Sequence, residues 1–123
     1  MTNLLEGLRI LVLEDEFLIA MDVEQLCRDH GANDVLIARS VEEIDPVDGV
    51  TNIDAAILDV MLGGNSTLDF ARTIHERGVP FVFASGYTDL SAITAKFPGV
   101  AVVGKPYAGN DLVEALASAY QRR

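Results

Sequence analysis

Five short apolar segments alternate along this chain with five segments of helical pattern, and this alternation restricts the possible folds more than any other feature. The apolar segments are Leu8–Leu13, Asp34–Ala38, Ile53–Leu58, Val79–Ala84 and Val100–Val103. The helical segments are Glu16–His30, Ser40–Ile44, Ser66–Arg77, Thr88–Phe97 and Asn110–Tyr120. Strands that are joined by right-handed helical crossovers form a parallel sheet with helices on both faces. We therefore predict an α/β fold built on one parallel sheet.

The length and composition fit a single folded domain. The chain has 123 residues, of which 50% are hydrophobic, enough for one core and too many for a disordered segment. Its formal net charge is −10, so the phosphate backbone of a nucleic acid or an anionic lipid surface would be repelled. We therefore expect residues 1–123 to form one domain that binds neither nucleic acid nor membrane.

Cysteine and histidine give no sign of a disulfide or of a metal–thiolate site. Cys27 is the single cysteine, so no internal disulfide can form. His30 and His75 lie near the ends of expected helices, share no ligand spacing with the acidic residues, and are expected at the surface. The chain has neither a signal peptide nor a long apolar run, which predicts a cytoplasmic protein.

The first expected helix, Glu16–His30, carries more apolar residues than one inward stripe requires. The stripe includes Cys27, which we expect to fill the core. Phe17, Leu18 and Met21 fall outside the stripe. Two interpretations stay open for these three residues: they pack against the last helix, or they form an exposed apolar patch that binds a partner protein.

Acidic residues follow the first and the third expected strands. Glu14, Asp15 and Glu16 come directly after the first strand, and Asp59 comes directly after the third. Because the carboxyl ends of parallel strands meet at one edge of a sheet, we expect these carboxylates to lie close together. Crowded carboxylates repel one another unless a cation neutralises them, and Mg²⁺ prefers oxygen ligands. The sequence predicts a Mg²⁺ site, although loop solvation and turn capping are the simpler alternatives for each acid alone.

A hydroxyl and a lysine follow the two remaining strands at the same edge. Ser85 comes directly after the fourth strand, and Lys105 comes shortly after the fifth. This set suits phosphoryl transfer, because Asp59 can act as a carboxylate nucleophile that forms an acyl phosphate. Lys105 and the metal can neutralise charge on the transferring group, and Ser85 can donate a hydrogen bond to the product.

The ordered set of site residues resembles the receiver domains of response regulators in bacterial two-component signalling, over nearly the whole chain. The resemblance implies a flavodoxin-like, doubly wound (βα)5 fold with strand order 2-1-3-4-5. It implies that Asp59 accepts a phosphoryl group from a histidine kinase or a histidine phosphotransfer protein, with Mg²⁺ as cofactor. The metal ligands that it implies are Glu14, Asp15, Asp59 and the backbone carbonyl of Met61.

The resemblance also assigns roles at the other strand ends. Lys105 and Ser85 would contact the phosphoryl group, and the bond between Lys105 and Pro106 would be cis. Met61 and Tyr87 stand where the family tunes its self-dephosphorylation, and their apolar bulk predicts slow hydrolysis. A kinase or phosphotransfer partner would dock close to Asp59, beside Phe17, Leu18 and Met21.

Residues Phe83–Tyr87 read Phe-Ala-Ser-Gly-Tyr and resemble a receiver subfamily marked by Phe-Ala-Thr-Gly and a nearby tyrosine. Many members of that subfamily are free-standing. We expect no output domain here, so the signal leaves by protein–protein contact or by onward transfer in a phosphorelay. Gly63 replaces the usual proline, which predicts a more mobile loop. Val102 replaces the usual Tyr or Phe, which puts the usual aromatic switch in doubt.

Three other functions fit less well. A flavodoxin-type FMN binder would share the fold, but Glu14–Glu16 would repel the FMN phosphate. A haloacid-dehalogenase-like phosphatase needs a second Asp and a Thr, where this chain has Met61 and Gly63. A degenerate receiver that binds proteins without being phosphorylated remains the alternative. We expect no enzyme activity beyond phosphorylation and dephosphorylation at Asp59.

Overall fold

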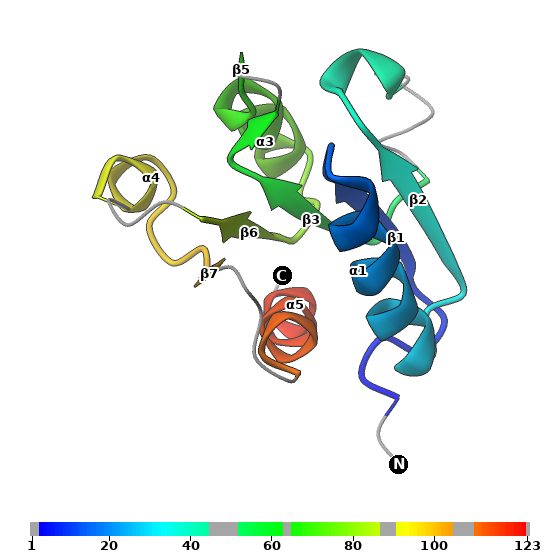
Figure 1. Cartoon of the computed structure of the whole chain (residues 1–123). Helices are drawn as coiled ribbons and strands as arrows, with labels where there is room; N and C mark the ends of the chain where they lie inside the picture. The colour runs from blue at the N-terminus through cyan, green and yellow to red at the C-terminus, as the bar shows by residue number, and fades with distance from the viewer. Residues whose placement is uncertain (1–2, 45–51, 63–64, 87–90, 105–109, 123) are drawn as a thin grey trace.

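A five-stranded parallel sheet organises the molecule (Figure 1). The computed structural model describes residues 3–44, 52–62, 65–86, 91–104 and 110–122. The strands of the sheet are β1 (Arg9–Leu13), β2 (Asp34–Ala38), β3 (Ala55–Asp59), β6 (Phe81–Ser85) and β7 (Val102–Gly104). Their order is β2-β1-β3-β6-β7. Counted in chain order within this sheet, the order is 2-1-3-4-5, so the predicted flavodoxin-like fold is confirmed.

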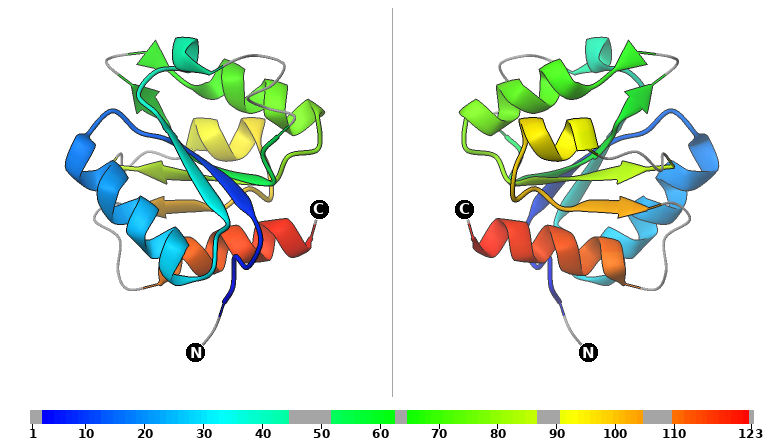
Figure 2. Two further views of the ribbon diagram at one scale, coloured as in Figure 1. Left: turned by 90° about the vertical axis from the view of Figure 1, so that its right-hand side faces the viewer. Right: turned by 90° about the vertical axis from the view of Figure 1, so that its left-hand side faces the viewer.

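Helices cover both faces of the sheet, as Figure 2 shows from two sides. The helical elements are α1 (Phe17–Asp29), the 3-10 turn η1 (Val41–Glu43), α3 (Leu68–Glu76), α4 (Ser91–Lys96) and α5 (Asp111–Gln121). One apolar cluster joins α1 and α5 to the sheet, and a second joins α3 and α4 to the opposite face. Within the described ranges, no helix has both the length and the apolar character needed to cross a membrane.

The two faces of the sheet are filled by alternate residues of the same strands. In β1, Ile10 and Val12 face α1 and α5, whereas Leu11 and Leu13 face α3 and α4. Successive side chains of a strand point to opposite faces, so a strand covered on both sides must be apolar at every position. This explains why the central strands were visible in the sequence as continuous apolar runs.

Cys27 belongs to the core, as predicted. Its side chain is fully buried between α1 and the sheet. Burial raises the pKa of the Cys27 thiol to about 12, because the thiolate would lose its hydration. The thiol is therefore protonated at neutral pH and acts as a small apolar side chain.

Strand β2 lies at one edge of the sheet, and acidic side chains cover part of that edge. The N–H of Val35 donates to Oδ1 of Asp34 at 3.0 Å, and the N–H of Arg39 donates to Oε1 of Glu43 at 2.9 Å. The opposite side of the strand pairs with β1 along its whole length. Leu36 projects from β2 on the α3 face and is exposed.

Two of the predicted helices differ from the structure. Helix α3 begins at Leu68 and not at Ser66, because Asn65–Ser66 form strand β5, which pairs antiparallel with β4 (Met61–Leu62). The segment Ser40–Ile44, predicted to be a helix, contains only η1. Ser40 has an extended backbone, and its side chain makes no cap hydrogen bond. The sequence around Pro46 and Gly49, expected to end that helix, lies outside the described residues.

The fifth strand starts two residues later than predicted. The N–H of Val100 donates to the carbonyl of Phe97 at 3.2 Å, so this residue still belongs to the turn after α4. Gly99 has a φ of +88°, which a residue with a side chain rarely adopts, and it makes that turn possible. The extended segment therefore begins only at Val102.

The prediction that both histidines lie at the surface is half wrong. His75 is exposed, but His30 is buried, with 8% of its surface accessible. Nε2 of His30 lies 3.4 Å from Oδ1 of Asn110, and its carbonyl accepts the N–H of Leu5 at 3.0 Å. Asn110 stands at the predicted cap position of α5 but makes no side-chain cap hydrogen bond. The end of α1 is thus packed against the beginning of α5.

Candidate functional site

Three carboxylates meet at the carboxyl edge of the central strands. Glu14 and Asp15 follow β1, and Asp59 ends β3, which pairs with β1 up to Leu13 and Leu58. Carboxylate oxygens of Glu14, Asp15 and Asp59 all lie within 4.8 Å of one another. We call this group the acid cluster. The sequence-based expectation that these side chains converge is correct.

The acid cluster is mostly shielded from solvent. Glu14 is 3% exposed and Asp59 is 8% exposed, while Asp15 is half-buried. The backbone N–H of Glu14 donates to the carbonyl of Ala38 at 3.0 Å, which fixes the turn after β1. Oε1 of Glu14 accepts the N–H of Glu16 at 3.1 Å.

These carboxylates fit a hard divalent cation. Like charges this close repel one another strongly when burial removes the surrounding water. Oxygen ligands near one another are what Mg²⁺ and Ca²⁺ require, and a site with several open positions favours Mg²⁺ with bound water or phosphoryl oxygens. The acid cluster of Glu14, Asp15 and Asp59 could therefore hold a metal ion.

A small hairpin follows β3 and returns the chain to the acid cluster. Strand β4 pairs Met61 with Ser66 of β5. The N–H of Met61 donates to Oδ1 of Asp59 at 3.3 Å. Just beyond β5, the buried hydroxyl of Thr67 lies in hydrogen-bond contact with the backbone carbonyl of Asp59.

Sequence reasoning missed both the hairpin and Thr67. Ser66 and Thr67 looked like the first residues of a helix, since both types are common at helix starts. The available signal was the Gly63-Gly64 pair between short segments, which is typical of a hairpin turn. Two-residue strands are too short to show a period of two, so the pattern alone did not reveal them.

Ser85 and Lys105 were predicted at the same edge. Ser85 ends β6, is 1% exposed, and pairs with Gly104 of β7, while its neighbour Ala84 pairs with Asp59. Ser85 therefore lies on the strand beside β3, at the carboxyl end of that strand. Lys105 follows Gly104 directly but lies outside the described residues.

Three further expectations fall on residues that are not described. These residues are Tyr87, Pro106 and Gly63, so shielding by Tyr87, the cis bond and the mobile loop stay predictions. Val102 is described: it is half-buried and pairs with Phe83 in the sheet.

Known proteins resemble this chain in sequence and in fold. No family model matches the chain. The transcriptional regulatory protein YvrH of Bacillus subtilis (strain 168) is 32% identical over 104 residues, which cover 84% of this chain and 43% of that protein. The chain thus matches less than half the length of this curated relative.

Solved structures of response regulators share the fold. A response regulator receiver protein from Sinorhizobium medicae WSM419 superposes with a TM-score of 0.79 at 23% identity, covering 95% of this chain and 97% of that chain. The response regulator PhyR from Brucella abortus gives a TM-score of 0.76 at 27% identity, covering 98% of this chain and 51% of that chain. The chain therefore has the fold of response regulator receiver domains.

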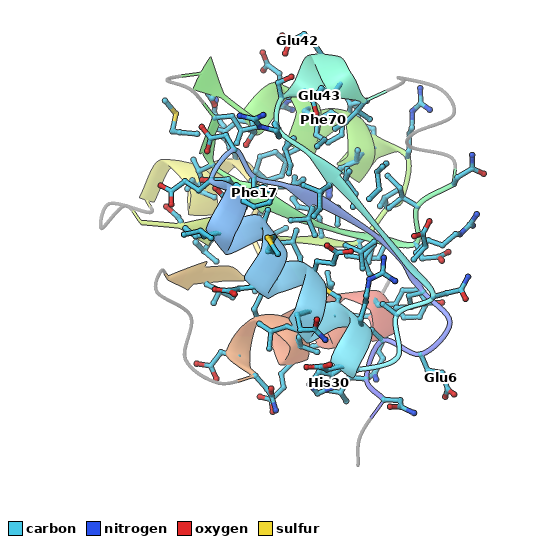
Figure 3. All side chains as sticks on the ribbon, turned by 45° about the vertical axis from the view of Figure 1, so that its right-hand side comes forward. Glu6, Phe17, His30, Glu42, Glu43 and Phe70 are labelled. Carbon is cyan, nitrogen blue, oxygen red and sulfur yellow. The ribbon has the colours of Figure 1, made fainter. Side chains whose placement is uncertain are left out.

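The molecule carries an exposed apolar surface at the start of α1, beside the acid cluster. Phe17, Leu18 and Met21 are 70%, 76% and 48% exposed. Figure 3 shows Phe17 at the beginning of α1, with His30 just beyond the other end of the helix. The three side chains are exposed, so packing against α5 is wrong, and binding of a partner by this patch stays a prediction. We call these three residues the α1 patch.

A groove reaches the acid cluster from the other side. It has a volume of about 960 Å³, runs between η1 and α3, and is lined by Asp15 where it meets the acid cluster. Glu42 and Glu43 lie on η1 above Phe70 of α3 (Figure 3), and all three line the groove. The acid cluster is therefore reached by solvent through Asp15.

Proposed function

We propose that this receiver domain accepts a phosphoryl group on Asp59 from a histidine kinase or a histidine phosphotransfer protein, in a Mg²⁺-dependent reaction. The observation that carries the proposal is the convergence of Glu14, Asp15 and Asp59, whose carboxylate oxygens lie within 4.8 Å of one another. If these three acids, at the ligand-binding edge of an α/β sheet, served only to stabilise the fold, apolar side chains in their place would serve better.

Each residue has a defined part in the proposed reaction. An oxygen of the Asp59 carboxylate attacks the phosphorus of a phosphohistidine, the phosphorus–nitrogen bond breaks, and its electron pair stays on the imidazole. Glu14 and Asp15 would hold Mg²⁺, which when bound would supply positive charge to the transferring oxygens. Ser85 donates a hydrogen bond to the phosphoryl product, and Lys105 adds a second positive charge.

The backbone carbonyl of Met61 is the fourth proposed metal ligand. Its own N–H donates to Oδ1 of Asp59 at 3.3 Å, so this side of the residue faces the acid cluster. In an extended residue the N–H and the carbonyl lie on the same side of the strand. This backbone direction supports a carbonyl ligand without any need for the thioether.

Beryllofluoride, a mimic of the phosphoryl group, tests the proposal directly. We expect the protein to bind it in the presence of Mg²⁺ and not after the metal is chelated, as followed by ¹⁹F NMR of the bound fluoride. A degenerate receiver, which is the alternative function, would bind proteins with no response to beryllofluoride. Absence of a bound signal at saturating Mg²⁺ would sink the phosphoacceptor proposal.

The sequence supports a proposal for how the domain passes on its signal. We propose that residues 1–123 act as one receiver of the Phe-Ala-Thr-Gly subfamily, supported by the Phe-Ala-Ser-Gly-Tyr segment at Phe83–Tyr87. Its signal would leave by protein contact or by onward phosphotransfer. A pull-down with and without beryllofluoride distinguishes a downstream partner that recognises the phosphorylated form from one that binds both forms.

The α1 patch predicts an effect on partner docking. We expect Leu18→Asp to slow phosphotransfer from the cognate histidine protein by about tenfold, because a buried interface leucine is worth roughly 1–2 kcal/mol. Labelling by acetyl phosphate, which needs no docking, should be unchanged. Leu36→Asp is the matched control, since Leu36 is also exposed but lies on the opposite face of the sheet. An equal loss in both reactions would mean that Leu18 supports the fold instead.

The lifetime of the phosphorylated state gives another prediction. Neither Met61 nor Tyr87 carries a carboxylate or amide that could orient water for attack on the phosphorus, and both supply apolar bulk that can exclude water, so hydrolysis should be slow. We expect Met61→Asn combined with Tyr87→Glu to accelerate loss of phosphate by about tenfold, equivalent to roughly 1.4 kcal/mol off the barrier. The rate is measured by decay of labelled protein after removal of the donor. If Tyr87→Ala alone leaves the rate unchanged and weakens partner binding, Tyr87 belongs to a partner surface.

A further inference from the structure

We infer that Thr67 is the residue that positions the acceptor end of β3, holding Asp59 and Met61 in the arrangement that binds metal and accepts phosphate. The inference rests on the proposed function, because it assigns the geometry of that same site to a residue that neither the sequence motifs nor the comparisons mark. We do not assign Thr67 as a metal ligand or as a contact of the phosphoryl group. It acts through the backbone of the residues that do.

The contacts of Thr67 converge on the strand end. Its hydroxyl lies in hydrogen-bond contact with the carbonyl of Asp59 and 3.1 Å from the carbonyl of Val60, and its single proton is shared between them. Its N–H donates to the carbonyl of Val60 at 2.9 Å. Thr67 is 1% exposed, so water cannot replace these bonds if the hydroxyl is removed.

The hydrogen-bond pattern of the hairpin carries this restraint to Met61. The N–H of Thr67 donates to the carbonyl of Val60, so these two residues stand in the position of a hydrogen-bonded pair just before the Met61–Ser66 pair. The next pair, Met61 with Ser66, is then of the non-hydrogen-bonded kind, since the two kinds alternate along an antiparallel ladder. The N–H and carbonyl of Met61 therefore face away from β5 and toward Asp59, whose Oδ1 accepts that N–H.

Thr67 does not use its hydroxyl in the way expected at a helix start. A threonine at the cap position normally accepts an N–H from the first turn of its own helix. Thr67 occupies that position before α3 but makes no side-chain cap hydrogen bond. Its neighbour Ser66 accepts the N–H of Leu68 at 3.1 Å instead. The hydroxyl of Thr67 thus bonds to the end of β3, and the hydroxyl of Ser66 accepts the N–H at the helix start.

The test compares Thr67→Val, which keeps the shape and removes the hydroxyl, with Thr67→Ser, which keeps the hydroxyl. Labelling by acetyl phosphate is measured against Mg²⁺ concentration, and thermal melting is recorded for each variant. We expect Thr67→Val to raise the half-saturating Mg²⁺ concentration by about tenfold, the effect typical of a residue that orients a metal ligand. Thr67→Ser should restore wild-type behaviour to within about twofold.

Ser66→Ala is the matched control, because it removes a hydroxyl one residue away that accepts the N–H of Leu68 at the start of α3. We expect it to leave the Mg²⁺ dependence unchanged. If Thr67→Val melts earlier but shows the wild-type Mg²⁺ dependence, the residue is merely structural and the inference is overturned. Should this variant not fold, Thr67→Ala at low temperature supplies the same comparison. Absence of labelling in the wild type would overturn the proposed function itself. Equal labelling of the wild type and Thr67→Val at every Mg²⁺ concentration would overturn only the role of Thr67.

Discussion

Replacing Asp59 by asparagine is expected to abolish labelling by acetyl phosphate in the presence of Mg²⁺. The amide is a poor nucleophile, and the substitution also removes one charged ligand from the acid cluster. The shape of the side chain is kept, so the strand end and its bond from the Met61 N–H are preserved in outline. Incorporation of labelled phosphate into the purified protein measures the effect. Undiminished labelling would mean that another residue is the acceptor.

Asp54→Asn is the matched control for this experiment. Asp54 precedes the opposite end of the same strand, where its Oδ2 accepts the N–H of Arg9 at 2.9 Å. The substitution makes the same change of charge at a site remote from the acid cluster. We expect Asp54→Asn to be labelled like the wild type, so that a loss seen only for Asp59→Asn is specific to the acceptor position.

The same Asp59→Asn variant should be more stable than the wild type when metal is absent. Asp59 is buried beside Glu14 and Asp15, and removing one of three like charges relieves their repulsion. A gain of about 1 kcal/mol would raise the melting temperature by several degrees in a domain of this size. The difference should shrink or reverse on addition of Mg²⁺, which the wild type binds better. A lower melting temperature for the metal-free variant would contradict the repulsion argument.

Asp15→Asn is expected to raise the half-saturating Mg²⁺ concentration for labelling by at least about tenfold, because loss of a direct carboxylate ligand weakens binding more than loss of a supporting residue. Asp15 is half-buried at the mouth of the groove and is the most accessible member of the acid cluster. Its removal should therefore disturb the fold little. At saturating Mg²⁺ the labelling rate should approach that of the wild type.

Glu16→Gln separates ligand loss from a general change of charge. Glu16 is adjacent in sequence and exposed, and its N–H donates to Oε1 of Glu14, a bond that the substitution keeps. We expect this control to change the Mg²⁺ dependence by less than about twofold, as exposed charges are well screened by salt. Equal shifts for Asp15→Asn and Glu16→Gln would show that Asp15 acts only through long-range charge.

Much of the fold could be predicted because its determinants are local and repeated. The bounds of β2 agree with the prediction, and the buried β1 and β3 appear as unbroken apolar runs. The acid cluster followed from topology alone, since parallel strands necessarily bring their carboxyl ends to one edge. The convergence of Asp59 with Glu14 needed no knowledge of side-chain positions.

The features that escaped prediction depend on contacts between segments distant in sequence. His30 is buried because the start of α5, at Asn110, packs against the end of α1, and no local pattern contains that contact. The hairpin consists of two-residue strands whose pairing is fixed by the return of Thr67 to the end of β3. The exposure of the α1 patch was likewise undecidable, because its periodicity fits a helix–helix contact equally well.

The covered edge of β2 has a consequence for how copies of this protein meet. An open edge strand invites a second sheet to pair with it, which leads to association and aggregation. Here the carboxylates of Asp34 and Glu43 occupy two N–H groups that another strand would need, and they carry negative charge toward any identical edge. When two copies approach edge to edge, these N–H groups are not available as donors and the carboxylates of the two copies repel each other. Both effects oppose pairing, even though Leu36 offers an apolar contact. Two acids outside the acid cluster thus make pairing of another strand at this end of the sheet less favourable.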